Sequence, residues 1–527
     1  MKVLVTEPVA REGLEMLKAH ADVEVRTGLS PHELEEAVRT ADGLLVRSET
    51  RVTRGVIEAG AHLRVIGRAG VGVDNIDVPA ATSRGIVVVN ARSGNTVSAA
   101  ELTVALLLAS ARHVPAADAS VRRGEWTRGA FMGVELRGKV AGIVGLGQIG
   151  SAVARRLRAL EMTVLGCDPF VPDERARMLG VELTELKALL ERADFVTLHT
   201  TLTPETKHLI GRDELALMKS GARLINTARG DLVDEVALAS ALDSGSLAGA
   251  ALDVFQKEPP GESPLTRHPK VVVTPHLGAS TTEAQERVAV DVAREMLLVL
   301  DGRPATSAVN APFVDPDAIQ VVGPYLAVAE TCGRLATQLA PGRFRDVELS
   351  FDGEIGNHEV EPLKAAAVAG LLAPISEERV NLVSVNHVIA ERGWNVVVRK
   401  GAAAGPYTNL VSIRLRTSAG DVAILGTLAH GRAHVVELNG FRVDVAPEQG
   451  HDHLLILENE DRPGRVGAIG TALGEMEVNI ASMDVGRRGP GEAIMVLTLS
   501  RALSAVELQR IGSTPGIARV VQARLSV

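Results

Sequence analysis

The chain has 527 residues, with a formal net charge of −9 at pH 7, 46% hydrophobic residues and 23% charged residues. These proportions are those of an ordinary globular protein with room for about three or four domains. The acidic balance argues against a protein that binds nucleic acid or a membrane surface, because such proteins carry basic patches. The two cysteines exclude a disulfide framework and a thiolate metal cluster.

Residues 1–95 alternate short apolar runs with helix-like stretches, and the strand candidates are residues 3–5, 23–25, 43–46, 63–66 and 86–90. This alternation predicts a parallel sheet with helices on both faces. Ser30, Pro31 and Glu33 predict a capped helix start. The N-terminus lacks a signal peptide's long apolar stretch, and no run approaches the ~18 apolar residues of a membrane span, so we expect a cytoplasmic protein.

Residues 97–113 predict a long, largely buried helix, after which the alternation resumes over residues 139–280. Its strand candidates are residues 140–144, 163–166, 195–198, 223–226, 249–252 and 271–274. Six such strands make a doubly wound sheet, and a second long helix is predicted over residues 280–300. We infer a nucleotide-binding domain at 97–284, inserted in a discontinuous first domain made of 1–96 and 285–310. A cleft would then separate two Rossmann-like domains.

The first of these strands runs into a G-x-G-x-x-G fingerprint formed by Gly145, Gly147 and Gly150. The fingerprint has its required context, a strand before it and a helix after it. The first glycine allows the tight turn, the second lets the backbone approach a pyrophosphate, and the third lets helix and strand pack closely. The N–H groups of a helix that begins near Gln148 and Ile149 would bind the phosphates. Asp168 ends the next strand, where an acid binds the ribose hydroxyl of NAD rather than NADP.

Three later strands of this region lead into reactive side chains: Arg229, Glu258 and His276. Ligands of open α/β sheets bind outside the carboxyl ends of the strands, so all three are candidates for one site. A guanidinium grips a carboxylate with two hydrogen bonds, and an imidazole can accept a hydroxyl proton near neutral pH. A carboxylate on the other imidazole nitrogen would fix its tautomer. Together they suit hydride transfer on a 2-hydroxy acid, although each alone could be a surface ion-pair partner, a loop residue or a helix cap.

The C-terminal part predicts two further domains. Residues 304–316 contain three prolines and read as a linker. Residues 317–450 form an α+β region with a predicted type I′ turn at Asn439-Gly440. Residues 452–527 read strand–helix–strand–strand–helix–strand, a ferredoxin-like βαββαβ pattern. Two helices can cover only one face of that sheet, so we expect this domain to pair with another copy of the chain.

The motifs GLGQIG, INTARGDLVDE, DVFQKEPP and PHLGAST resemble the D-isomer-specific 2-hydroxyacid dehydrogenases. GRAGVGVDNID, SGNTVSAAE and FMGVEL are most similar to the long branch of that family, which oxidises 3-phospho-D-glycerate to 3-phosphohydroxypyruvate, the first step of L-serine biosynthesis. The resemblance covers about the first 310 residues. NEDRPGRVGAIG and EVNIASM resemble an ACT domain that binds L-serine. The resemblance therefore implies NAD as the cofactor, feedback inhibition by serine, and a homotetramer.

The resemblance also implies roles for individual residues. Arg229, Glu258 and His276 take the catalytic roles. Besides the fingerprint and Asp168, it implies cofactor contacts by Thr200, Thr227, Ala228, Asp253, Gly278 and Ala279. It implies substrate contacts by Arg47, Arg68 and Asn95, and by Arg128 from a partner subunit. It implies effector contacts by Asn459, Asp461 and Asn479.

Two other functions remain open on the sequence alone. The chain could oxidise another 2-hydroxy acid, such as glycerate, lactate or 2-hydroxyglutarate. It could also be a non-catalytic scaffold that senses NAD, because corepressors share this fold.

Overall fold

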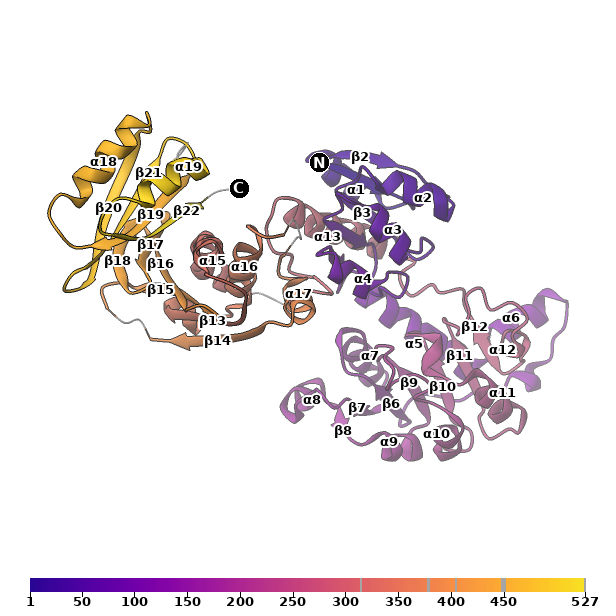
Figure 1. Cartoon of the computed structure of the whole chain (residues 1–527). Helices are drawn as coiled ribbons and strands as arrows, with labels where there is room; N and C mark the ends of the chain where they lie inside the picture. Colours follow the sequence, from indigo (N-terminus) through magenta and orange to yellow (C-terminus); the bar gives the residue numbers. More distant parts are fainter. Residues whose placement is uncertain (313–314, 377–379, 403–404, 447–451, 526–527) are drawn as a thin grey trace.

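The computed structural model describes residues 1–312, 315–376, 380–402, 405–446 and 452–525 (Figure 1). Their strands form four sheets. Residues 313–314 of the expected linker, and the ends of the two C-terminal regions at 450 and 527, lie outside this description.

The first sheet is parallel and five-stranded, in the order β2-β1-β3-β4-β5. Its strands are β1 (Lys2–Val5), β2 (Asp22–Val25), β3 (Gly43–Val46), β4 (Val65–Arg68) and β5 (Val87–Asn90), and its helices are α1 (Arg11–Lys18), α2 (Pro31–Val38), α3 (Arg54–Ala59) and α4 (Val78–Ser83). The capping box predicted at Ser30 and Glu33 is present. The strand predicted at 63–66 lies two residues further on, because the Leu63 N–H donates to the Gly60 carbonyl oxygen and closes the turn that precedes the strand.

The second sheet is parallel and seven-stranded, in the order β12-β11-β10-β9-β6-β7-β8. Its strands are β6 (Val140–Val144), β7 (Thr163–Cys167), β8 (Glu182–Leu183), β9 (Phe195–Leu198), β10 (Arg223–Asn226), β11 (Gly249–Leu252) and β12 (Val271–Val273). Its helices are α5 (Thr96–Arg112), α6 (Val114–Arg122), α7 (Gln148–Ala159), α8 (Asp173–Leu179), α9 (Leu186–Arg192), α10 (Arg212–Leu217), α11 (Glu235–Asp243) and α12 (Pro264–Arg267), with 3₁₀ turns η1 (Arg128–Phe131) and η2 (Gly230–Leu232). The sequence prediction omits the seventh strand, β8, because a strand of only two residues is too short to show an apolar run or an alternating pattern.

Two long helices connect the parallel-sheet domains. Helix α5 packs against α7 and β11 of the seven-stranded sheet, whereas α13 (Thr282–Leu300) returns to pack on α1, β4 and β5 of the first sheet. Val292 and Met296 of α13 are buried in the same core as Val3 and Val65. The chain therefore leaves the first sheet and comes back to it, as Figure 1 shows.

The third sheet is mixed and six-stranded, in the order β14-β13-β15-β16-β17-β18. Its strands are β13 (Phe344–Gly353), β14 (Asn395–Gly401), β15 (Asn409–Thr417), β16 (Val422–Ala429), β17 (Arg432–Leu438) and β18 (Phe441–Val445). Its helices are α14 (Pro316–Val322), α15 (Leu326–Leu339), α16 (Glu361–Leu372) and α17 (Val385–Arg392), with 3₁₀ turns η3 (Gly323–Tyr325) and η4 (Glu354–Asn357). Asn439 and Gly440 have φ angles of 49° and 84°, which a type I′ turn requires.

The fourth sheet is antiparallel, in the order β20-β21-β19-β22, which is the predicted ferredoxin-like arrangement. Its elements are β19 (His453–Glu460), α18 (Arg465–Glu475), β20 (Ile480–Gly489), β21 (Glu492–Leu499), α19 (Ala505–Gly512) and β22 (Ile517–Arg524).

The second face of this sheet is covered within the same chain. Leu454, Ile456, Val496 and Ala523 share one hydrophobic core with Leu335 and other residues of α15. Helix α15 lies against β22 of this sheet (Figure 1). This part of the face is therefore not free for another copy of the chain, whereas pairing of the domain with another copy stays a prediction. The sequence reveals that two helices leave a face open, but it does not identify the element that fills it.

Over the described residues, no single helix is long and apolar enough to span a membrane, and the only pair that reaches the required length and composition, Thr96–Arg112 with Val114–Arg122, is bent by 63°.

Candidate functional site

The glycine turn after β6 leaves space for a phosphate group. Gly145 has φ 91°, and a side chain there would collide with the backbone of His199. Gly147 is the N-cap of α7, and a Cβ atom at this position would meet no atom within 4 Å. A Cβ atom at Gly150 would overlap the carbonyl oxygen of Gly145, so helix and turn are in close contact there. The α7 N-terminus therefore presents bare backbone, which fits the pyrophosphate of a dinucleotide.

Two buried or half-buried side chains support this turn. The Asp168 carboxylate accepts hydrogen bonds from the backbone N–H groups of Leu146, at 2.8 Å, and Phe170, at 2.9 Å. Asp168, directly after β7, thus fixes the turn. His199 lies behind Gly145, and burial lowers the pKa of its imidazole to about 3, so this histidine stays neutral.

Asp253, directly after β11, holds the loop that carries His276. Its carboxylate accepts hydrogen bonds from the Thr274 hydroxyl at 2.5 Å, the Leu277 N–H at 2.7 Å and the Gly278 N–H at 2.9 Å. Burial raises the pKa of Asp253, and these hydrogen bonds oppose that rise. The backbone N–H of His276 donates to the backbone carbonyl oxygen of Asp253 at 2.9 Å. This hydrogen bond fixes the position of the main chain from which the imidazole extends.

The imidazole of His276 and the carboxylate of Glu258 are in direct contact. Nδ1 of His276 lies 2.7 Å from Oε2 of Glu258, and both side chains remain accessible, with 43% and 38% of their area exposed. Burial favours a raised pKa for Glu258, but the hydrogen bond from His276, the Phe255 N–H and the charges of His276 and Arg229 outweigh it, so the pKa of Glu258 is lowered. With Nδ1 held by Glu258, Nε2 of His276 is left for a substrate.

Arg229 follows β10 and lies between Glu258 and the first domain. Its Nη1 donates to the Ala228 carbonyl oxygen at 2.6 Å, and its Nε donates to Oδ2 of Asp74 at 2.8 Å. Asn226 secures this turn, since its side chain donates to the Arg229 carbonyl and accepts from the Ala228 N–H. Arg229, Glu258 and His276 therefore form one electrostatic cluster, in which the charge of Arg229 helps to lower the pKa of Glu258.

Two arginines of the first domain extend this cluster. Burial, together with the charge of Arg229, lowers the pKa of Arg68 to about 10, and Nε of Arg68 has no hydrogen-bond partner among the described residues. Arg47 is half-buried and donates to the Pro8 carbonyl oxygen at 3.1 Å. Asn95, the N-cap of α5, keeps a buried Oδ1 atom without a partner among these residues. Both polar atoms are therefore unsatisfied within the described residues.

The structure adds three residues that the sequence prediction omits: Glu7, Asn75 and Asp74. Glu7 accepts hydrogen bonds from the backbone N–H groups of residues 47, 49 and 50, and Asn75 donates to the carbonyl oxygens of residues 47 and 50. They hold the loop that presents Arg47. Glu7 follows strand β1, so the strand-end rule points to it, whereas Asp74 and Asn75 lie in a turn between β4 and α4, where no strand-end pattern marks them.

Arg128 does not join the cluster in this chain. It is exposed on η1, and its guanidinium lies over the ring of Trp126, 5.6 Å from the ring centroid. Trp126 itself is 72% exposed.

The remaining expected cofactor residues lie on loops after the strands of the second sheet. The Thr227 hydroxyl is 2.8 Å from that of Thr103, the Thr200 hydroxyl donates to the Thr201 carbonyl oxygen, and the Ala279 carbonyl oxygen accepts from Gln285.

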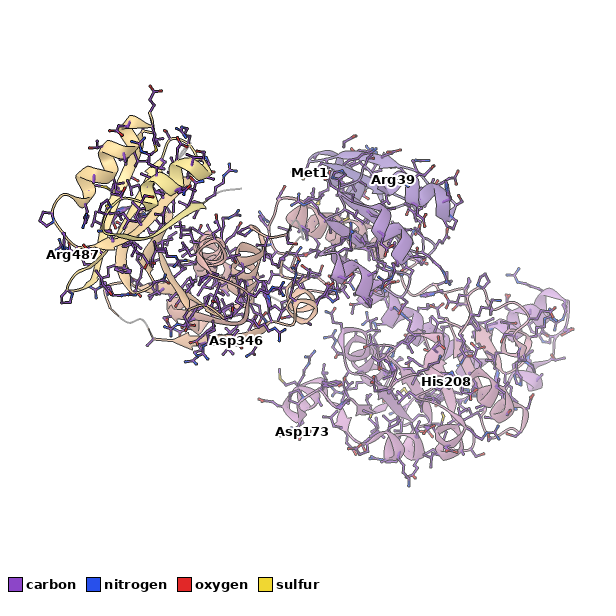
Figure 2. All side chains as sticks on the ribbon, viewed as in Figure 1. Met1, Arg39, Asp173, His208, Asp346 and Arg487 are labelled. Atoms are coloured by element: carbon purple, nitrogen blue, oxygen red, sulfur yellow. The ribbon has the colours of Figure 1, made fainter. Side chains whose placement is uncertain are left out.

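The three expected effector residues do not meet within one chain. Asn459 is buried, and its Oδ1 has no partner among the described residues. Asp461 pairs with Arg487 at 2.9 Å, on the outer edge of the C-terminal domain (Figure 2). Asn479 is exposed and directly precedes β20. Ile480, the first residue of β20, pairs with Leu499 of β21, and Leu499 also pairs with His453. His453 begins β19, at the end opposite Asn459. Six residues of strand, roughly 20 Å, therefore separate Asn479 from Asn459.

A cavity of about 310 Å³ lies in the third domain, away from this cluster. It is lined by Tyr325, Tyr407, Asn409, Thr427, His434 and Asp444, among others.

Comparison with known proteins matches three segments. Residues 104–278 match the D-isomer specific 2-hydroxyacid dehydrogenase NAD binding domain, residues 321–439 the D-3-phosphoglycerate dehydrogenase intervening domain, and residues 453–515 the ACT domain. NAD is accordingly the cofactor whose phosphates fit the bare α7 N-terminus.

Relatives match over the whole chain. D-3-phosphoglycerate dehydrogenase of Methanocaldococcus jannaschii is 43% identical, with 100% of both chains covered. That of Synechocystis is 45% identical over 98% of this chain and 93% of the relative.

Among solved structures, the TT0316 protein from Thermus thermophilus has a TM-score of 0.55 at 41% identity, covering 59% of this chain and all of its own. D-lactate dehydrogenase from Aquifex aeolicus, complexed with NAD and lactic acid, has a TM-score of 0.52 at 27% identity, covering 57% and 96%. The sequence identity over the full length and the three matched domains show that this chain belongs to the D-3-phosphoglycerate dehydrogenases, in the form with an intervening and an ACT domain.

Proposed function

We propose that the chain oxidises 3-phospho-D-glycerate to 3-phosphohydroxypyruvate with NAD⁺, the first step of L-serine biosynthesis. The observation that carries the proposal is the contact between His276 and Glu258 beside the guanidinium of Arg229. A base and a carboxylate-binding cation at the carboxyl ends of an NAD-binding sheet suit the oxidation of a 2-hydroxy acid.

In this proposal Arg229 binds the substrate carboxylate. Nε2 of His276 accepts the proton of the 2-hydroxyl group as the hydride leaves the same carbon. Glu258, ionised and bonded to Nδ1, stabilises the imidazolium that results. NAD⁺, when bound, supplies the hydride acceptor. In the reverse direction the same imidazolium returns the proton.

Arg47, Arg68 and Asn95 bind the phosphate end of the substrate in our proposal, and Arg128 is contributed by a partner subunit. Unpartnered Nε of Arg68 and Oδ1 of Asn95 support this assignment, because buried polar atoms without partners are costly unless a ligand satisfies them. The exposure of Arg128 and Trp126 supports a role toward another subunit.

For the cofactor we propose contacts by the glycine turn, by Gln148 and Ile149 at the start of α7, by Asp168, and by the loops after the strands. The residues of those loops are Thr200, Thr227, Ala228, Asp253, Gly278 and Ala279.

We also propose serine as an inhibitor that binds between two ACT domains, with Asn459 and Asp461 from one chain and Asn479 from another. The separation of these residues within one chain supports a shared site, since one copy alone cannot supply all three. A homotetramer in the cytoplasm, with domains at 1–96 with 285–310, 97–284, 317–450 and 452–527, completes the proposal.

The test is the formation of NADH, followed by its absorbance, with equal concentrations of 3-phospho-D-glycerate, D-glycerate, D-lactate and D-2-hydroxyglutarate. We expect the phosphorylated substrate to have the highest kcat/KM. A higher value with an unphosphorylated acid would reject the proposed substrate, and no turnover with any of them would favour the scaffold.

A further inference from the structure

One ion pair joins the two parallel-sheet domains at the candidate site. Oδ2 of Asp74 lies 2.8 Å from Nε of Arg229, although 155 residues separate them in the chain. Asp74 stands in the loop between β4 and α4 of the first domain, whereas Arg229 follows β10 of the second. Arg229 is thus oriented by a residue of the opposite domain.

The other donors of Arg229 are also constrained. Nη1 donates to the Ala228 carbonyl oxygen, and Nη2 lies so close to Gly72 that a Cβ atom there would overlap it. The loop at 72–74 therefore contacts both Nε and Nη2. A planar guanidinium held at two of its nitrogens has a defined plane, which two-bond recognition of a carboxylate requires.

Asp74 also lies within a cluster of cations. Arg68 and Arg229 repel one another, which adds to the effect of burial in lowering the pKa of Arg68, and Asp74 acts in the opposite sense. Removal of Asp74 would leave the two guanidinium groups free to separate.

We infer that Asp74 is a positioning residue for the oxidation: it holds the Arg229 fork in place only when the two domains are together, and so couples domain approach to carboxylate binding. The inference rests on the substrate-binding role proposed for Arg229. The opposite possibility is that Asp74 occupies Arg229 in place of the substrate carboxylate and competes with it.

The experiment is a double-mutant cycle in the full-length enzyme. Asp74→Ala, Asp74→Asn, Arg229→Lys and Asp74→Ala/Arg229→Lys are compared for kcat and KM with the phosphorylated substrate, for KM with NAD⁺ and for NADH affinity by fluorescence. Asp74 is 60% exposed, so its variants should fold. The matched control is Glu182→Gln, which removes a carboxylate from the exposed 2.7 Å pair with Arg192 far from the site.

We expect Asp74→Ala to lower kcat/KM for the hydroxy acid by about 10- to 100-fold, as misplacement of a binding group does, with NADH affinity unchanged. Asp74→Asn, which keeps an oxygen for Nε, should lose less. In the Arg229→Lys background the Asp74→Ala change should have an effect of no more than about twofold.

A lower KM in Asp74→Ala would overturn the inference in favour of competition. An equal fold-loss in both backgrounds would also overturn it, because Asp74 would then act independently of Arg229. If Arg229→Lys itself kept wild-type kcat/KM, the role proposed for Arg229 would fail instead, so the two failures are distinguishable.

Discussion

Nδ1 of His276 lies 2.7 Å from Oε2 of Glu258, across 18 residues of sequence, and this contact leaves Nε2 of the imidazole for a substrate. The two residues come from loops after different strands, β11 and β12. Asp253, Arg229 and the glycine turn also follow strands of this sheet, so they lie on the same edge as the proposed catalytic pair.

Loss of the imidazole should remove proton transfer but not cofactor binding. We expect His276→Ala to lower kcat by about 10²- to 10⁴-fold, the usual contribution of general acid–base catalysis, while NADH affinity measured by fluorescence stays the same. Glu258→Gln should lower kcat less, because the amide can still contact the imidazole. Wild-type turnover in His276→Ala would contradict the assignment.

Glu258 should make stability depend on pH. Its pKa is lowered in the folded protein, so the ionised carboxylate stabilises the fold above the unfolded pKa of about 4.3, and this contribution is lost as pH falls through the lowered folded value. Urea unfolding at pH 6 and pH 3.5 should show that Glu258→Gln destabilises the protein more at pH 6. An equal difference at both pH values would contradict this prediction.

Arg68 should distinguish phosphorylated from unphosphorylated substrates. Although burial lowers its pKa to about 10, the guanidinium remains charged at pH 7. We expect Arg68→Gln to weaken use of the phosphorylated substrate, with a rise in its KM by about 10- to 100-fold, as the loss of a charged hydrogen bond does, and to change the kinetics with D-glycerate little. Similar losses with both substrates would place Arg68 away from the phosphate.

The absence of a side chain at Gly147 should be needed for binding of the cofactor but not for folding. A Cβ atom at this position meets no neighbour, and the residue has φ −62°, so Gly147→Ala should leave the melting temperature unchanged. It should raise KM for the cofactor NAD⁺ by at least about tenfold, since the methyl group would occupy the path of the pyrophosphate. Gly467→Ala, at another position with no neighbour within 4 Å, is the control.

The proposed inhibition by serine should require two chains. Asn459→Ala and Asn479→Ala should each abolish inhibition when expressed alone, with activity retained. Co-expressed and purified as a mixed oligomer by two different tags, the variants should regain part of the inhibition. Each ACT pair formed from one copy of each variant has one site with both asparagines intact. No recovery in the mixed species would argue for a site within one chain. Point variants are preferable to truncation, because deletion of the ACT domain would expose the core that it shares with α15.

The sequence by itself determined the local structure and the residue types of the site. Strands β6, β9, β10 and β11, the capped helix at Ser30 and the turn at Asn439-Gly440 depend on neighbouring residues, and periodicity, cap chemistry and left-handed turns are local properties. The strand-end rule likewise indicated Arg229, Glu258 and His276, because parallel strands bring their carboxyl ends to one edge.

Only the tertiary structure decided which groups touch. The contact of Asp74 with Arg229, the packing of α15 on the ACT sheet and the separation of Asn459 from Asn479 each depend on residues distant in sequence. No periodicity within a segment encodes such contacts, since they depend on how complete domains pack and on the register of paired strands.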